Sequence, residues 1–183
     1  MKKRILSFTL ALALILALIP AAAPVTATAG VPGTYYPGDI AVINNIIRNN
    51  GLSWTPAPAD GSFVPEDWGY TLEIIDDLGV DRGVVWSFDT FNKRVTGLFL
   101  VQLDLTGILD MSGLTELITL LCHNNRLTAL IINDNHLLQS LYVGINQLTE
   151  LDVSNNTLLE SLLCWDNQLT TLDLNKNTAL TIL

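Results

Sequence analysis

Residues 141–161 read LYVGINQLTELDVSNNTLLES and residues 162–182 read LLCWDNQLTTLDLNKNTALTI, so one 21-residue pattern occurs twice in succession. The pattern extends back to residue 120 and starts again at Leu183. An internal period of this length indicates a solenoid, in which each repeat covers the apolar face of its neighbour. Seven positions hold the same residue type in all three copies; in the first copy they are Leu120, Asn125, Leu127, Thr128, Leu130, Asn135 and Leu138.

Each repeat holds two half-repeats. Leu141 and Val143 stand two residues apart, and Leu151 and Val153 replay this spacing ten residues later. Alternating apolar residues point to one side of an extended segment. We therefore predict a β-rich, flattened coil with short parallel strands and one apolar core. The first repeat begins at Leu98 and is one residue longer than the others, as terminal repeats often are.

Two asparagines recur in every regular repeat, at the predicted corners of the coil. A tight corner turns backbone groups away from water, where an unpaired group costs about 1–3 kcal/mol. An asparagine amide carries two donors and an acceptor and can satisfy these groups. We predict structural ladders rather than ligand contacts, formed by Asn125, Asn146 and Asn167 and by Asn135, Asn156 and Asn177.

Residues 1–29 have the pattern of a secretory signal peptide. A basic start (Met1-Lys2-Lys3-Arg4) precedes an apolar run at 5–19 and the small-x-small site Ala27-Thr28-Ala29. The alternative is a membrane anchor, but this run is shorter than the roughly 20 residues that span a bilayer. We predict export to the cell surface or medium, with no membrane span in the mature chain.

Residues 30–97 form the predicted lead-in and N-terminal cap. Asp39 can cap a helix at about 40–50, and Gly51 suits its left-handed end. A loop at 55–65 follows, then an ambiguous stretch at 71–78 that reads as helix rather than strand. The first strand is predicted at about 84–88.

The repeats occupy 98–183, and no polar closing element follows them in this sequence. Solenoids need such an element at their ends. We therefore expect either that the chain is a piece of a longer protein or that another surface covers this end.

Charge and cysteine content narrow the classes further. The net charge is −9, and loss of Lys2, Lys3 and Arg4 would leave six basic against 18 acidic residues, or −12. Such a chain repels nucleic acid. Cys122 and Cys164 lie two periods apart, hence about 9–10 Å apart at the usual strand spacing. This exceeds the span of a disulfide, so we expect two free, buried thiols.

The repeats resemble those of bacterial leucine-rich repeat proteins. The run Asn124-Asn125-Arg126-Leu127-Thr128 and its copies carry the resemblance, and Leu162 to Asn177 fits the exported type written Leu-x-Cys-x-x-Asn-x-Leu-x-x-Leu-Asp-Leu-x-x-Asn almost entirely. Arg94-Val95-Thr96-Gly97-Leu98 similarly looks like an entry to the first repeat. The resemblance implies a curved leucine-rich repeat solenoid with an N-terminal helical cap, which binds proteins or glycans at the cell surface.

The sequence gives little support to an enzyme. His123 and His136 fall in no metal-ligand or triad pattern, and Cys122 faces away from the adjacent His123 on a strand. We expect no catalytic residues, cofactor or structural metal. Asp152 and Asp173 share a repeat position, but calcium wants six or more converging oxygens. A solvated acidic face is the preferred interpretation, and calcium binding stays open.

Outward positions of the first half-repeat suggest a binding surface. Residues one and three places after each repeat leucine should face away from the core. A contiguous apolar and aromatic patch of this kind often marks an interaction site. We predict binding of a protein partner; a glycan stacked on Trp165 and Tyr142 or a structural spacer are the alternatives. The predicted surface consists of Leu121, His123, Tyr142, Leu163 and Trp165.

Overall fold

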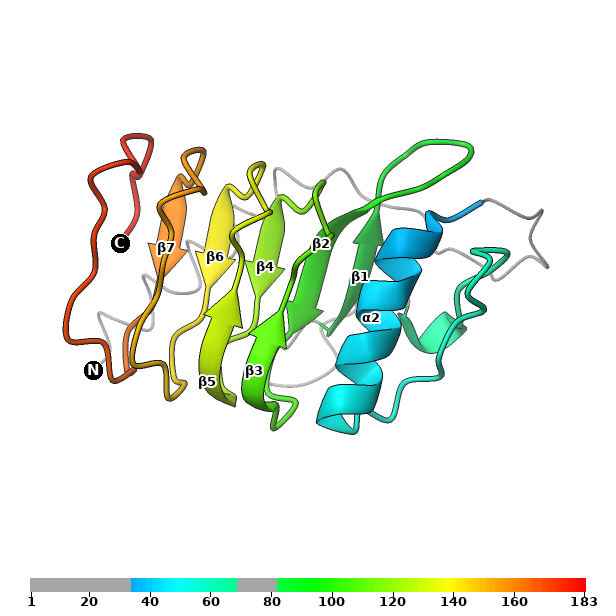
Figure 1. The fold of residues 1–183 in the computed structure, drawn as a ribbon, viewed down its shortest axis with the longest axis horizontal. Helices are drawn as coiled ribbons and strands as arrows, with labels where there is room; N and C mark the ends of the chain where they lie inside the picture. The colour runs from blue at the N-terminus through cyan, green and yellow to red at the C-terminus, as the bar shows by residue number, and fades with distance from the viewer. Residues whose placement is uncertain (1–33, 69–81) are drawn as a thin grey trace, which may run out of the picture.

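The chain forms a coil of short parallel strands that starts beside a helix (Figure 1). The computed structural model describes residues 34–68 and 82–183. The predicted leucine-rich repeat solenoid with an N-terminal helix is confirmed. In chain order the elements are α2 (Pro37–Asn50), a 3-10 turn (Glu66–Trp68), β1 (Arg82–Trp86), β2 (Val95–Leu100), β3 (Thr106–Asp110), β4 (Thr119–Leu121), β5 (Arg126–Ile131), β6 (Ser140–Tyr142) and β7 (Ser161–Leu163).

The 21-residue period corresponds to one turn of the coil. The larger sheet has the order β1-β2-β4-β6-β7, and β2, β4, β6 and β7 run parallel. The first leucine of each repeat pairs with the first leucine of the next. The same residue type therefore stacks along the solenoid. The register joins Leu98, Leu120, Leu141 and Leu162.

The extra length of the first repeat is taken up between β2 and β3, where the offset between paired residues falls from 22 at Phe99 and Leu121 to 20 at Thr106 and Arg126. Leu98 pairs with Leu120, 22 residues on, whereas Leu109 pairs with Leu130, 21 residues on. The pairing of β3 with β5 shifts register between Gly107 and Ile108, and Gly107 has a φ of 71°. This shift leaves Thr128 of β5 unpaired and brings the offset to the regular 21 residues, and glycine tolerates the left-handed conformation at position 107.

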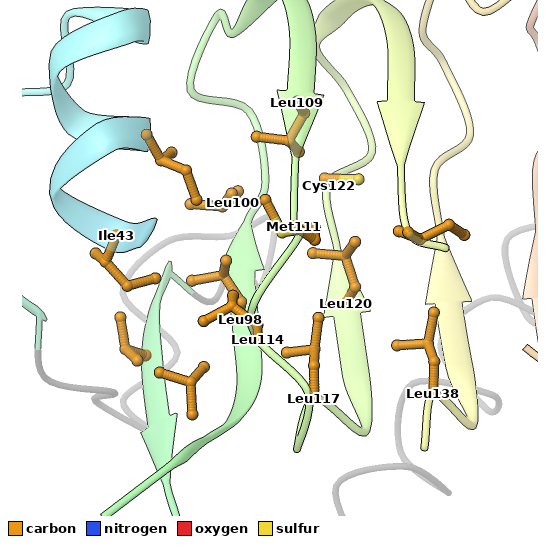
Figure 2. Close-up of a cluster of buried hydrophobic side chains, with 14 of the residues drawn as sticks. Ile43, Leu98, Leu100, Leu109, Met111, Leu114, Leu117, Leu120, Cys122 and Leu138 are labelled. Carbon is orange, nitrogen blue, oxygen red and sulfur yellow. The ribbon is translucent and has the colours of Figure 1, made fainter. Parts of the chain in front are cut away.

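The core lies between the two sheets and under the helix. Figure 2 shows Ile43 of α2 close to Leu98, with Leu120 and Cys122 farther along the same apolar layer. These side chains are fully buried. Each buried leucine or isoleucine contributes about 1.5–3 kcal/mol relative to exposure. The predicted inward alternation of leucines is confirmed.

Helix α2 closes the N-terminal end of this core. Ile40, Ile43 and Ile47 are buried on one face, and Gly51 ends the helix with a φ of 62°. The predicted cap at Asp39 is wrong: the helix begins at Pro37, and Tyr36 holds the N-cap position without a side-chain hydrogen bond. Proline suits the first turn because its missing N–H would have no helical partner there.

Asp39 instead joins the helix to the sheet. Its buried carboxylate accepts hydrogen bonds from Arg94 Nε (3.0 Å), Arg94 Nη2 (3.0 Å) and the Val95 N–H (2.8 Å). The Arg94 guanidinium also lies 4.2 Å from the centre of the Tyr36 ring. These hydrogen bonds hold α2 against the start of β2. Removing either Asp39 or Arg94 would leave the other charge without its partner, which is costly for a buried group.

The first strand lies near the predicted place but is shifted. It spans Arg82–Trp86 instead of about 84–88, and it runs antiparallel to β2. The regular pairing is interrupted between Val85 and Trp86, and beyond it Ser87 still contacts Arg94: its N–H donates to the Arg94 carbonyl at 2.8 Å and its Oγ accepts the Arg94 N–H at 3.0 Å. The predicted signal peptide and the stretch 71–78 lie outside the described residues. Within the described ranges, no helix is long and apolar enough to cross a membrane.

The asparagines bind backbone groups at the corners, but the two ladders differ. Asn146 Nδ2 donates to the carbonyls of Cys122 and Val143 (both 3.0 Å), and its Oδ1 accepts the Leu127 N–H at 2.9 Å. Asn156 Nδ2 likewise donates to two carbonyls, at 3.0 and 2.9 Å. Its Oδ1 has no partner among the described residues. The first ladder therefore pairs with both N–H and C=O groups of the backbone, whereas the second pairs with C=O groups only.

We predict that Asn146→Ala destabilises the fold more than Asn156→Ala. The first change leaves four buried backbone groups without their amide partner, the weakest being the Gly144 carbonyl at 3.4 Å. The second leaves two and also removes an oxygen that has no partner. Stranded buried groups cost about 1–3 kcal/mol each, so Asn146→Ala should lower the unfolding free energy by about 1–2 kcal/mol more. Urea midpoints of both variants test this, with exposed Gln147→Ala as a control expected within about 0.5 kcal/mol of wild type. Equal midpoints for the two asparagine variants would contradict the difference between ladders.

Candidate functional site

The predicted binding column lies on the face of the larger sheet opposite the main core. Strand pairing joins Leu121 to Tyr142 and Tyr142 to Leu163, and it adds Phe99 of β2 at the other end. These four side chains follow the solenoid axis on one face because they hold the same register position. The sequence therefore predicted the direction of these side chains correctly.

Their predicted exposure is wrong. Leu121 and Tyr142 are buried, at 2% and 0% exposure, in a second apolar cluster with Phe99 and Val101, and Leu163 is half-buried against it. Large side chains on strands less than about 5 Å apart pack on one another and leave little open area. Ser161 Oγ donates to the Tyr142 hydroxyl at 3.2 Å, which anchors the polar end of that ring.

His123 is also buried, contrary to the prediction that it contributes to an open surface. Its side chain is 7% exposed, and desolvation lowers its pKa from 6.5 to about 4. The imidazole is therefore neutral at pH 7. It shares its repeat position with Gly144 and Trp165, at the corner that follows β4, β6 and β7.

Trp165 is the residue of the predicted surface that stays open. Its side chain is 37% exposed, just beyond the end of β7. The ring lies over Gly144 of the preceding repeat, so close that a Cβ on Gly144 would stand 2.8 Å from two ring carbons. Gly144 thus provides the space in which the indole ring rests. One side of the ring is supported and part of it faces solvent.

The sequence analysis missed Ile145, whose backbone is hydrogen-bonded to that of Trp165. Ile145 is 41% exposed, and its N–H donates to the Trp165 carbonyl at 2.9 Å. Its φ is 53°, close to the φ of its repeat equivalents Asn124 (58°) and Asp166 (51°). Asparagine and aspartate tolerate this left-handed conformation, whereas a β-branched residue is rare in it. An isoleucine among asparagine and aspartate at one repeat position was the signal available in the sequence.

The acidic face on the other side of the coil has a structural role. Asp152 and Asp173 each accept the backbone N–H of the residue two places on, at 2.9 Å, and Asp110 does the same at 2.8 Å. The hydrogen bonds from Ser154 lower the pKa of Asp152. Within residues 34–68 and 82–183, no three His, Cys, Asp or Glu side chains converge in a way that could hold a metal ion. The carboxylates therefore stabilise turns.

Both cysteines are free. Cys122 is fully buried, and desolvation raises the pKa of its thiol to about 12. Cys164 is half-buried, so the prediction of complete burial is wrong for this residue. Burial also raises its thiol pKa. Both thiols stay protonated at neutral pH and are poor nucleophiles.

Comparison with known proteins adds one likeness. The fold is a leucine-rich repeat solenoid. Part of the chain is similar to a solved structure, the functional domain of InlJ from Listeria monocytogenes, which includes a cysteine ladder, with 21% identity and a TM-score of 0.24. The match covers 52% of this chain and 42% of that one, so the chain spans under half of that domain. At this TM-score the likeness carries no argument, and the fold assignment rests on the strand register and the asparagine ladders.

No family model and no curated protein matches the chain. Ile145 and Trp165 are exposed at the corner after β6 and β7.

We predict that His123 makes the fold sensitive to mild acid. The pKa of His123 is about 4 in the folded chain and about 6.5 in the unfolded chain, so between these pH values the unfolded chain binds a proton that the folded chain does not bind. The stability is complete above pH 6.5 and declines as the pH falls toward 4, by at most about 1.4 kcal/mol per pH unit. Urea unfolding at several pH values should show this loss in wild type and in exposed His136→Gln, but not in His123→Gln. The same slope in His123→Gln would assign the loss to other groups.

Proposed function

We propose that this chain is a non-enzymatic binding module that recognises a protein partner at the cell surface or in the medium. The observation that supports this function is the Trp165 ring, which is seated on Gly144 and 37% exposed. Aromatic side chains that are held in place and partly open to solvent dominate the energetics of protein interfaces. Ordering such a ring on binding costs little entropy because its position is already restricted.

The rest of the predicted column offers little open surface for a partner. Leu121 and Tyr142 are buried beside it in the second apolar cluster, and Leu163 is half-buried. A rigid scaffold beneath an exposed anchor is the usual arrangement in binding sites. The proposed contact surface is therefore smaller than the column predicted from the sequence.

A non-catalytic role agrees with the chemistry of the groups best able to react. His123 is held neutral and buried, with a pKa of about 4, and Cys122 is held protonated, with a pKa of about 12. A general base needs a pKa near the working pH, and a cysteine nucleophile needs a thiolate. Leucine-rich repeat solenoids are, in general, scaffolds for recognition.

A glycan is the second candidate ligand. The exposed part of the Trp165 indole could stack on a sugar ring, but Tyr142 is buried and cannot serve as the second platform that the sequence suggested.

We further propose that the chain divides into a signal peptide at residues 1–29, a cap at 30–97 and repeats at 98–183. Export rests on the basic start, apolar run and small-x-small site of that first segment.

We predict that Trp165→Ala removes binding while the fold persists. The full mature chain would be used to capture and crosslink proteins of the native cell surface, identified by mass spectrometry. Truncating an aromatic anchor costs about 2 kcal/mol or more, or roughly thirtyfold in affinity. The thermal midpoint should change little, whereas Tyr142→Ala should lower it because that ring is fully buried.

Leu158→Ala is the matched control, since Leu158 is 44% exposed but lies at the opposite corner, before β7. It should leave capture unchanged. Capture that survives Trp165→Ala would contradict the proposed site. Glycan-array binding that depends on Trp165, without protein capture, would establish the second candidate in its place.

A further inference from the structure

Ile145 stands in a backbone conformation that disfavours its own side chain. Its φ of 53° lies in the left-handed region, where a β-branched side chain crowds the backbone. The equivalent corners hold Asn124 and Asp166, whose short polar side chains tolerate this region. The repeat therefore offers residue types that fit the corner better, and position 145 departs from them.

Packing does not account for the isoleucine. Its side chain is 41% exposed, so it gains only part of the burial that would offset the strain. Strain that neither the backbone nor the core requires tends to occur at functional positions. The exposed face of Ile145 is therefore a candidate contact for a molecule outside the chain.

Ile145 and Trp165 lie at the same corner of the coil, on adjacent turns, and we name these two exposed residues the corner patch. The Ile145 N–H donates to the Trp165 carbonyl at 2.9 Å, and the Trp165 ring covers Gly144, the residue before Ile145. The two exposed apolar side chains therefore belong to adjacent turns of the coil. Together they offer a rigid apolar anchor point on an otherwise polar corner.

The net charge of the repeats indicates the kind of partner. Residues 98–183 carry nine acidic and two basic residues, a net charge of −7. Of these two, Arg126 is paired with Asp104 at 3.2 Å, and Lys176 lies near Asp152 on the acidic face. Asp166 directly follows Trp165 and is exposed. A field of this sign favours approach of a cationic surface and disfavours an anionic one.

We propose that the corner patch binds a basic protein segment that inserts a large apolar side chain between Ile145 and Trp165. This inference rests on the proposed function and adds the second anchor and the chemistry of the partner. The apolar contact supplies the anchor, and the net negative charge of the repeats, with exposed Asp166 beside the patch, favours a basic segment.

Ile145→Asn provides the test, because asparagine is the native residue at the equivalent corner of the preceding repeat. The change relieves backbone strain and should raise the thermal midpoint by about 2–6 °C. The mature chain would be panned against a displayed library of random 15-residue peptides. We expect the enriched peptides to be cationic, to carry a large apolar residue, and to bind Ile145→Asn about tenfold more weakly. Their binding should also fall about tenfold in 0.5 M NaCl.

The outcomes separate this inference from the proposed function. Peptides that require Trp165 but bind Ile145→Asn normally, or that show no excess of basic residues, would overturn the inference and leave the function standing. Enriched peptides that bind Trp165→Ala as well as wild type would contradict the proposed site itself. Leu158→Ala again serves as the control and should retain full binding.

Discussion

The structure depends on how backbone groups are satisfied where the coil turns inward. At each corner the carbonyl and amide groups of adjacent turns point away from water, and one asparagine amide bonds to both turns, as Asn146 does with Cys122, Val143 and Leu127. Because each amide links two successive turns, its position fixes the register between them. The parallel pairing of Leu120 with Leu141 then follows, and so does the stacking of like residues along the axis.

A single repeat predicts one buried face and one open face for the larger sheet, but stacking of the repeats buries apolar side chains on both faces. One face supplies the main core, and the other collects Phe99, Leu121 and Tyr142 in a second buried cluster. One place with open apolar side chains is the corner where the chain leaves β6 and β7. Ile145 and Trp165 lie there, supported by a sheet that is packed on both faces. Recognition at a stiff corner requires little rearrangement of the scaffold.

The sequence period predicted the features that recur in every repeat. The inward leucines, the two asparagine ladders, the free cysteines and the end of the helix at Gly51 all follow from spacing and from residue chemistry. Burial of Tyr142 could not be predicted, because alternation gives the direction of a side chain and not what packs beside it. The role of Asp39 was missed because its partner, Arg94, lies 55 residues away. Ile145 was overlooked because its conformation depends on the corner geometry that the repeat imposes.

The reversed direction of β1 has a consequence for self-association. A parallel sheet of like rungs presents, at its first strand, a row of unpaired N–H and C=O groups that could recruit strands from other molecules. Here β1 runs antiparallel along β2 from Arg82 to Trp86, with an irregularity between Val85 and Trp86. The Arg82 side chain extends the cover by donating to the carbonyls of Val101 and Gln102. Another copy therefore cannot add a parallel rung directly to β2, because the antiparallel strand β1 already occupies that edge.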